Sequence, residues 1–323
     1  MRSGMKWWSP NMVNGCITEI KVNSHFVNHN WISLPLMNWA AAPARSGCAG
    51  KLEIQIDRTG PKRDQAGPKI MKGDGLMMEP SDILLAERLA TEAGQILLAL
   101  QQSGRYEGKA LGAAGDAAAN DHLMASLRAE RPQDAILCEE ERDNPDRLSA
   151  RRVWIVDPLD GTREYGEGRT DWAVHVALAI EGAPVVGAVA LPALGLTLSS
   201  GQTMNMPPAN TPPRMLVSRT RPAAEAVSVA EAVGAVLHPM GSAGAKAMAV
   251  VRGEADIYLH TGGQYEWDNC APAAVAKAAG LHVSRADGRP LVYNNPDTYL
   301  ADLLICRQEW AERVLALVAD LAK

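Results

Sequence analysis

From residue 153 to residue 165 the sequence reads Val-Trp-Ile-Val-Asp-Pro-Leu-Asp-Gly-Thr-Arg-Glu-Tyr. The first four residues are apolar and mostly β-branched, which predicts a short inner strand over 153–156. Pro158 fixes φ and has no amide hydrogen, so we expect the strand to end there in a turn. Two carboxylates, those of Asp157 and Asp160, stand three residues apart across this turn.

The composition of this turn is typical of a site for a hard cation. If the turn is tight, the carboxylates of Asp157 and Asp160 and the carbonyl oxygen of Leu159 can face one point, an arrangement suited to Mg²⁺. Gly161 permits a close backbone approach or a positive φ. Thr162 can open the next segment with free N–H groups, which favour a phosphate. The alternative is an ordinary Asp-Pro-x-Asp-Gly turn whose carboxylates are only solvated.

The bulk composition is that of a soluble globular protein with an acidic balance. The chain has 323 residues, 47% hydrophobic and 21% charged, and a formal net charge of −5. These values predict one large domain or two ordinary ones and no nucleic-acid partner. We find no apolar run long enough to span a membrane and no signal peptide. Five cysteines without paired spacing favour a reducing compartment, so we expect a cytoplasmic protein.

The sequence predicts a chain in three parts. Residues 1–77 show no sustained periodicity, and we interpret them as a disordered or spurious N-terminal extension, with an extra arm as the alternative. Residues 78–204 are expected to form an N-terminal α+β subdomain with the metal site. The Pro-rich stretch 205–213 is interpreted as a linker. Residues 214–323 are expected to form a C-terminal α/β subdomain that completes the active site.

Apolar periodicity indicates the elements of the N-terminal part. A helix capped by Ser81 or Asp82 is expected to run to about residue 100. A polar loop through Gly115 follows, and Asp116 stands where the N-cap of a second helix is expected. Strands are predicted at 135–138 and 196–199, with a hairpin of 173–180 and 184–191 between them.

The C-terminal part alternates strands and helices. Strands are expected at 215–217, 236–238, 257–259, 282–284 and 303–306. Helices are expected at 222–235, from 241 to about 251, from Asp268 to about 279, and at the C-terminus. The alternation indicates a mixed α/β layered structure.

Acidic residues gather at the ends of predicted elements, which is where α/β proteins place their active sites. They are Glu139, Glu140, Asp157, Asp160, Asp268 and Asp116. Two unit charges 4 Å apart repel by about 4 kcal/mol at an effective dielectric constant of about 20. Converging carboxylates therefore need protons or divalent cations. Two Mg²⁺ would offset four of them and leave positions open for a phosphate, as in a two-metal phosphoryl hydrolase.

From about residue 79 to residue 323 the chain resembles the lithium-inhibited, Mg²⁺-dependent phosphatases of the inositol monophosphatase superfamily. The signatures are Trp154-Ile-Val-Asp-Pro-Leu-Asp-Gly-Thr162, and Trp267-Asp268 followed by Ala271, Ala274 and Ala279-Gly280. Asp116, followed by Cys138-Glu-Glu140, fits the family's upstream spacing. Within the superfamily, Glu164 and the stretches 241–248 and 260–268 resemble the CysQ-type 3'(2'),5'-bisphosphate nucleotidases of actinobacteria.

The resemblance implies a fold and an activity. The fold would be an α-β-α-β-α sandwich of the inositol monophosphatase and fructose-1,6-bisphosphatase type. The activity would be Mg²⁺-dependent hydrolysis of the 3'-phosphate of adenosine 3',5'-bisphosphate to AMP and phosphate, a step of sulfur assimilation. Inositol monophosphatase or fructose-1,6-bisphosphatase activity is the alternative, and a catalytically silent nucleotide-binding protein is a third. A homodimer is left open.

The resemblance also implies roles for individual residues. Glu139, Asp157 and the Leu159 carbonyl would hold one Mg²⁺, and Asp157, Asp160 and Asp268 a second. Glu139 and Thr162, with Asp116 behind Thr162, would orient and deprotonate the attacking water. The substrate would be bound by Gly161, Thr162, Ser242, Lys246 and Asp268.

Some features leave alternatives open. Lys246 would supply positive charge for a second phosphate, and the alternative is a solvated helix lysine. The histidines show no metal-ligand spacing and are interpreted as structural. Ala113 stands where many relatives carry Thr, so the outer metal-binding loop differs from theirs.

Overall fold

The structure, a computed structural model, describes residues 11–13, 16–19 and 79–321. The chain divides into two units, Met1–Gly73 and Asp74–Lys323. In the first, an antiparallel pair joins β1 (Asn11–Val13) to β2 (Cys16–Glu19), two strands that we did not predict. The rest of the predicted extension 1–77 lies outside the described residues, so its interpretation stays a prediction.

The first large sheet of the second unit has five strands in chain order. They are β3 (Ala135–Cys138), β4 (Arg152–Asp160), β5 (Ala173–Ile180), β6 (Ala183–Leu191) and β7 (Leu196–Ser199). β3 and β4 are parallel, and the other neighbours are antiparallel. Short 3₁₀ turns lie at Pro145–Ser149 and Pro192–Leu194. Two long helices, α1 (Pro80–Gln102) and α2 (Gly108–Glu130), share a buried apolar core with one face of this sheet.

The second large sheet has the order β12-β14-β10-β8-β9. Its strands are β8 (Arg214–Ser218), β9 (Val236–Met240), β10 (Ile257–His260), β12 (His282–Ser284) and β14 (Leu303–Cys306). A separate two-stranded pair joins β11 (Gln264–Tyr265) to β13 (Tyr299–Leu300). None of the helices described within residues 79–321 is long and apolar enough to cross a membrane.

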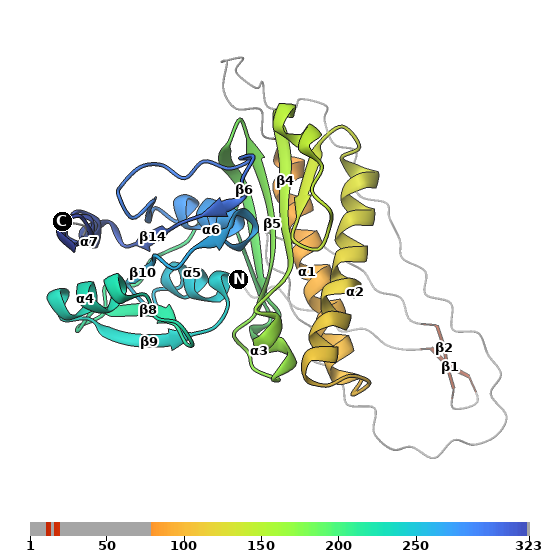
Figure 1. Cartoon of the computed structure of the whole chain (residues 1–323). Helices are drawn as coiled ribbons and strands as arrows, with labels where there is room; N and C mark the ends of the chain where they lie inside the picture. The colour runs from red at the N-terminus through yellow and green to blue at the C-terminus, as the bar shows by residue number, and fades with distance from the viewer. Residues whose placement is uncertain (1–10, 14–15, 20–78, 322–323) are drawn as a thin grey trace, which may run out of the picture. The chain divides into compact units, whose positions relative to one another are not determined.

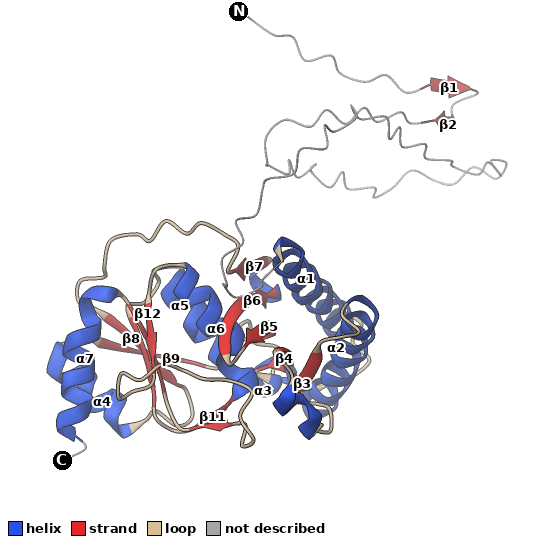
Figure 2. Cartoon of the chain, turned by 90° about the horizontal axis from the view of Figure 1, so that it is seen from above, coloured by secondary structure: helices blue, strands red, loops and turns tan. Residues whose placement is uncertain are grey.

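Helices fill the space between the two sheets and cover the outer face of the second. α5 (Ala243–Val251) and α6 (Glu266–Ala278) share one apolar core with both sheets. α4 (Ala224–Val233) and α7 (Gln308–Leu321) share another with the outer face of the second sheet. Figure 1 shows these layers in succession, and Figure 2 shows them from above. The predicted α-β-α-β-α sandwich is confirmed.

Every strand of the first sheet precedes residue 204, and every strand of the second follows residue 213. Residues 203–210 between them form no regular element. These observations support the boundaries 78–204 and 214–323, which we keep as a proposal. The two parts are packed together by α6, which belongs to the C-terminal part and contacts β5 and β6 of the first sheet.

The second helix begins earlier than the sequence predicted. α2 starts at Gly108, so Asp116 lies inside the helix and the interpretation of Asp116 as an N-cap was wrong. The alanine-rich run 113–119 favours helix and outweighs the glycines beside it. A Cβ on Gly112 would lie 2.8 Å from Thr162 Cγ2, and one on Gly115 would lie 2.8 Å from Tyr165 Cε1. The glycines that suggested a loop therefore allow close packing.

The ends of two other helices also differ from prediction. The N-cap of α1 is Glu79, not Ser81 or Asp82, and the Asp82 side chain accepts the Glu79 N–H at 3.1 Å. Asp268 is the third residue of α6 rather than its first. In both helices the acid still serves the N-terminus, because it accepts a backbone N–H from one turn earlier.

The strand β4 continues past Pro158, so the predicted abrupt end was wrong. Asp157 pairs with His175 of β5 and Asp160 with Ala173, and the register shifts between them. Two residues of β4 therefore oppose one of β5, which is a β-bulge. In a regular strand, residues three apart point to opposite faces. The bulge adds one residue, and this lets both carboxylates turn to the same side of the sheet.

Candidate active site

Three carboxylates from distant parts of the chain meet at one point. Asp157, Asp160 and Asp268 each place an oxygen atom within 4.8 Å of the others. The first two come from the bulge of β4 and the third from the first turn of α6. The Asp268 carboxylate also accepts the N–H of Tyr265 at 2.6 Å. The predicted convergence of these acids is therefore confirmed.

Asp157 has a buried oxygen atom that accepts no hydrogen bond within residues 79–321, and His175 Nδ1 lies 3.9 Å from it. Its Oδ1 accepts the N–H of Leu159 at 3.0 Å, whereas no described residue forms a hydrogen bond with Oδ2. Burial, with the charge of Glu139 next, raises the pKa of Asp157 well above its usual range. An ionised buried oxygen in this position is costly unless a cation compensates it. The position therefore fits a metal ligand.

Glu139 and Asp268 complete an oxygen-rich set. Crowding by the surrounding protein and the charge of Asp268 raise the pKa of Glu139 to about 7, although part of its side chain is open to solvent. The charge of Glu139 in turn helps to raise the pKa of Asp157. Burial and the charge of Asp160 raise the pKa of Asp268 to about 6. Carboxylate oxygens that resist ionisation without a cation are suited to Mg²⁺, so these residues fit a divalent metal.

Asp160 differs from the other acids because it also closes the N-terminus of α5. Its oxygens accept the hydroxyl of Ser242 at 2.5 Å and the N–H groups of Ala243 and Gly244 at 3.1 and 2.6 Å. Burial alone would raise its pKa, but His175 and these donors lower the pKa to about 2. A carboxylate has about four acceptor positions. Ser242, Gly244 and the His175 ring all face Oδ2, whereas Oδ1 accepts only the Ala243 N–H, so about one position on Oδ1 is left for a cation.

His175 lies directly against the acids. It is fully buried, its Nδ1 is 2.9 Å from the Trp267 carbonyl oxygen, and its Nε2 is 3.2 Å from Asp160 Oδ2. Burial lowers its pKa, but Asp160 more than compensates, so the pKa is raised. A Cβ on Gly244 would lie only 2.0 Å from this nitrogen. The sequence did not indicate that this histidine borders the site.

Thr162 and Asp116 are brought together as the resemblance implied. The Thr162 hydroxyl lies 3.1 Å from the Leu159 carbonyl oxygen and 3.5 Å from Asp116 Oδ1. Burial and the charge of Glu140 raise the pKa of Asp116 to about 7. The pairing holds although Asp116 comes from the middle of α2 rather than from its start. The roles of these residues and of Gly161 in handling water and phosphate stay predictions.

A pocket of about 330 Å³ opens beside the acids. Five of the site residues that the resemblance implied line it, namely Asp160, Gly161, Ser242, Lys246 and Asp268, and so does Glu164. Its size is at the lower end of the range for small-molecule sites.

Lys246 is not the solvated lysine that the alternative interpretation required. It is 5% exposed, and its ammonium donates to the carbonyl oxygens of Gly241 at 2.5 Å and Ser242 at 2.7 Å. The ammonium also lies 5.3 Å from the centre of the Tyr258 ring. Burial lowers the pKa of Lys246 to about 8.

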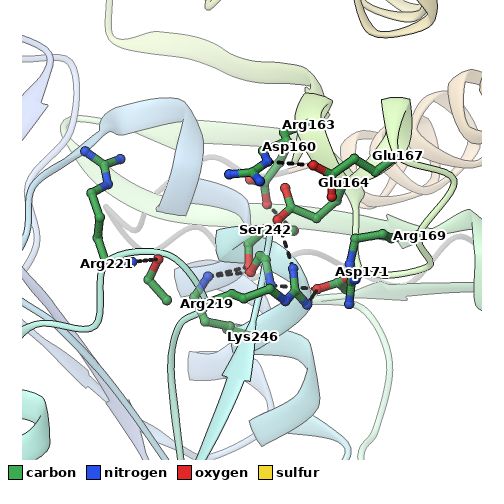
Figure 3. A network of polar contacts seen from close by, with 12 residues as sticks. Asp160, Arg163, Glu164, Glu167, Arg169, Asp171, Arg219, Arg221, Ser242 and Lys246 are labelled. Carbon is green, nitrogen blue, oxygen red and sulfur yellow. Dashed lines mark hydrogen bonds and ion pairs between the residues drawn. The ribbon is translucent and has the colours of Figure 1, made fainter. Parts of the chain in front are cut away.

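The pocket also contains an ion-pair network that the sequence analysis missed. Arg219, at the end of β8, donates to Glu164 at 2.9 Å and to Asp171. Asp171 also accepts the N–H of Gly241 at 2.6 Å. Figure 3 shows this network beside Ser242 and Lys246. The basic residues that follow the predicted strand in Ser218-Arg-Thr-Arg221 were the signal that could have located it.

The layered fold and the carboxylate cluster define a class of protein, an α/β sandwich with a site for a divalent cation. The sequence model of the inositol monophosphatase family matches residues 81–323. The chain belongs to this family, whose members depend on a metal, typically Mg²⁺.

Curated relatives agree with this assignment, and a solved structure shares the fold. The chain is 47% identical over 259 residues to a 3'-phosphoadenosine 5'-phosphate phosphatase of Mycobacterium leprae, which covers 75% of this chain and 95% of the relative. It is 32% identical over 202 residues to the 3'(2'),5'-bisphosphate nucleotidase CysQ of Escherichia coli, covering 58% of this chain and 81% of that protein. The crystal structure of CysQ from Bacteroides thetaiotaomicron superposes with a TM-score of 0.62 at 23% identity, covering 71% of this chain and 97% of that one.

Proposed function

We propose that the protein is a Mg²⁺-dependent phosphatase that hydrolyses the 3'-phosphate of adenosine 3',5'-bisphosphate to AMP and phosphate in sulfate assimilation. The observation that carries the proposal is a cluster of Asp157, Asp160 and Asp268 that opens on a pocket bearing basic side chains. A metal site beside cationic groups suits a substrate with more than one phosphate. The name of the mycobacterial relative supports the choice of nucleotide.

The acidic residues would hold two or more Mg²⁺. We assign Glu139, Asp157 and the Leu159 carbonyl to one ion, and Asp157, Asp160 and Asp268 to another. The unpartnered Asp157 Oδ2 supports this assignment. Bound Mg²⁺ would supply positive charge to the phosphate oxygens as the bond breaks. The raised pKa of Asp268, about 6, is the electrostatic cost that such charge would relieve.

Proton handling falls to residues beside the cluster. We assign Glu139 and Thr162 to the water that attacks phosphorus, with Asp116 behind Thr162. The pKa of Asp116, about 7, supports this role, because a general base is most effective when its pKa is close to the operating pH. The Thr162 hydroxyl, 3.5 Å from Asp116 Oδ1, would take a proton from the water and pass its own to the Asp116 carboxylate. Gly161 and Thr162 N–H groups would bind the scissile phosphate.

The test is phosphate release by the purified full chain with and without Mg²⁺ and Li⁺. The substrates are adenosine 3',5'-bisphosphate, inositol 1-phosphate and fructose 1,6-bisphosphate. We expect the highest kcat/KM on the nucleotide, dependence on Mg²⁺, and inhibition by Li⁺. A higher kcat/KM on either sugar phosphate would assign the protein to the alternative activities. Calorimetric binding of the nucleotide without phosphate release would identify a silent binding protein.

We also infer a cytoplasmic location. Three cysteines of the described part of the chain, Cys138, Cys270 and Cys306, are free and buried. Free thiols are the usual state in a reducing compartment.

A further inference from the structure

Four cationic side chains line the pocket beside the carboxylate cluster. They are Arg163, Arg219, Arg221 and Lys246. A substrate with two phosphates brings one of them to the metal site, and the other then needs a cation of its own. The contacts that each of the four already makes decide which one can serve.

Lys246 and Arg219 are already engaged by the protein. The Lys246 ammonium has three hydrogens and donates to two backbone carbonyl oxygens, those of Gly241 and Ser242. These contacts hold the turn in which Ser242 has a φ of 27°, a value that costs backbone strain and needs support. Arg219 uses both terminal nitrogens on the carboxylates of Glu164 and Asp171.

Arg163 is engaged as well, at the surface. Its guanidinium pairs with Glu167 at 2.8 Å, and the side chain is 66% exposed. An exposed pair of this kind contributes little and is screened by salt. What distinguishes Arg163 from the remaining cation is therefore not its exposure but that it already has a carboxylate partner, Glu167.

Arg221 is the remaining cation. Its side chain is exposed. Within residues 79–321, which the structure describes, its guanidinium binds no carboxylate or carbonyl oxygen, and only its backbone N–H donates, to Ser218 Oγ at 3.3 Å. Figure 3 shows Arg221 apart from the network of Arg219, Glu164 and Asp171. Burial lowers the pKa of the neighbouring His260, so this ring is neutral at neutral pH and adds no positive charge for a phosphate.

We propose that Arg221 binds the second, non-reacting phosphate of the substrate, and that Lys246 instead positions the Gly241–Ser242 turn. The assignment rests on the proposed function, since it presumes a bisphosphate substrate. A guanidinium offers a planar fork of donors that matches a phosphate in two places, whereas an ammonium acts as a point charge. Arg221 therefore confers preference for a bisphosphate over a monophosphate.

The experiment compares two substrates that differ by that phosphate alone. The full chain and its variants are assayed with Mg²⁺ on adenosine 3',5'-bisphosphate and on adenosine 3'-monophosphate. We expect Arg221→Gln to lower kcat/KM on the bisphosphate by about 10- to 100-fold, as for the loss of one charge-assisted contact. The lower kcat/KM should come mainly from a higher KM, and kcat/KM on the monophosphate should not change. Arg221→Lys should recover part of the loss.

Two further variants separate binding from general effects. Arg313→Gln removes one positive charge from α7, where Arg313 contacts the Ala232 carbonyl oxygen, and should change neither substrate. Lys246→Met should lower kcat on both substrates alike, because it releases the turn that carries Ser242.

The outcomes distinguish this assignment from the proposed function. Suppose that the wild type prefers the bisphosphate. If Arg221→Gln then lowers kcat/KM equally on both substrates, or on neither, the role of Arg221 is refuted while the function stands. If Lys246→Met impairs only the bisphosphate, the second phosphate belongs to Lys246 instead. If the wild type releases no phosphate from the bisphosphate, the proposed function fails, and the assignment of Arg221 fails with it.

Discussion

Replacing Asp268 by Asn should stabilise the metal-free protein while it abolishes catalysis. Asp268 stands in the carboxylate cluster, where burial and the charge of Asp160 raise its pKa to about 6. Without a metal, its negative charge therefore opposes folding at neutral pH. Asn removes that charge and retains an oxygen that can accept the N–H of Tyr265. It also removes a ligand that we assign to Mg²⁺, so turnover should fall close to background.

The expected change in the free energy of unfolding follows from the pKa shift of Asp268. The pKa of Asp268 rises from an ordinary 3.8 to about 6, and each pKa unit corresponds to about 1.4 kcal/mol. Ionisation in the folded state therefore costs about 3 kcal/mol. A negative charge in the first turn of a helix returns about 0.3–1 kcal/mol, which leaves a net gain of about 2 kcal/mol for Asn. For a domain of this size that is an increase of about 4–8 °C in Tm.

The stability gained by replacing Asp268 with Asn depends on pH. Because the folded pKa lies above the unfolded value, the native state holds the proton more tightly. The stability contributed by Asp268 is fully present below about pH 4, the usual pKa of Asp, and is lost as the pH rises through about 6. The advantage of Asn should therefore be largest at pH 8 and shrink to about one third at pH 4.5.

The assay is thermal unfolding of wild type and Asp268→Asn in EDTA at pH 4.5 and pH 8, and again at pH 8 with Mg²⁺. Mg²⁺ should raise the Tm of the wild type more than that of the variant. The matched control is Asp297→Asn, since Asp297 is exposed and also accepts a backbone N–H, that of Tyr299, at 3.0 Å. A lower Tm for Asp268→Asn in EDTA at pH 8, or an equal rise at both pH values, would refute the electrostatic reasoning.

Three further predictions concern other parts of the site. Asp157→Asn should abolish nearly all phosphate release with the fold retained by circular dichroism, and full residual activity would contradict its assignment as a metal ligand. Arg219→Gln should lower stability by about 1–3 kcal/mol, because it leaves the largely buried carboxylate of Glu164 without its paired cation and leaves Asp171 with Arg169 alone. An unchanged Tm would argue against the network. Gly244→Ala should lower the free energy of unfolding in denaturant by about 1–3 kcal/mol, since the added methyl would lie 2.0 Å from a ring nitrogen of the buried histidine on β5. If the variant were as stable as the wild type, α5 would have to shift freely to make room for the methyl group.

Most element positions followed from local patterns. The strands at 135–138, 173–180, 196–199, 282–284 and 303–306 have the predicted bounds, because most of them are apolar or alternating runs that end at polar or turn-forming residues. The start of α2 could not be predicted, because Gly112 and Gly115 resemble loop residues until their tertiary neighbours are known. The pair β11 and β13 is too short for a periodic signal, and it depends on pairing between Tyr265 and Tyr299.

The acids of the site could be predicted, whereas the division of work among its cations could not. Asp157 and Asp160 are close in sequence, and the cost of gathering like charges made a cation site the simplest explanation for them. The partners of Arg219 lie 55 and 48 residues away, so no local pattern indicates that its charge is already used. The acceptors of Lys246 are only four and five residues away, yet they become its partners because Tyr258 and the helix bury the ammonium. A charged residue in the sequence is therefore only a candidate for binding a ligand. Its folded environment decides whether the charge is already paired within the protein. For this reason Arg221, rather than Lys246, is the residue to test.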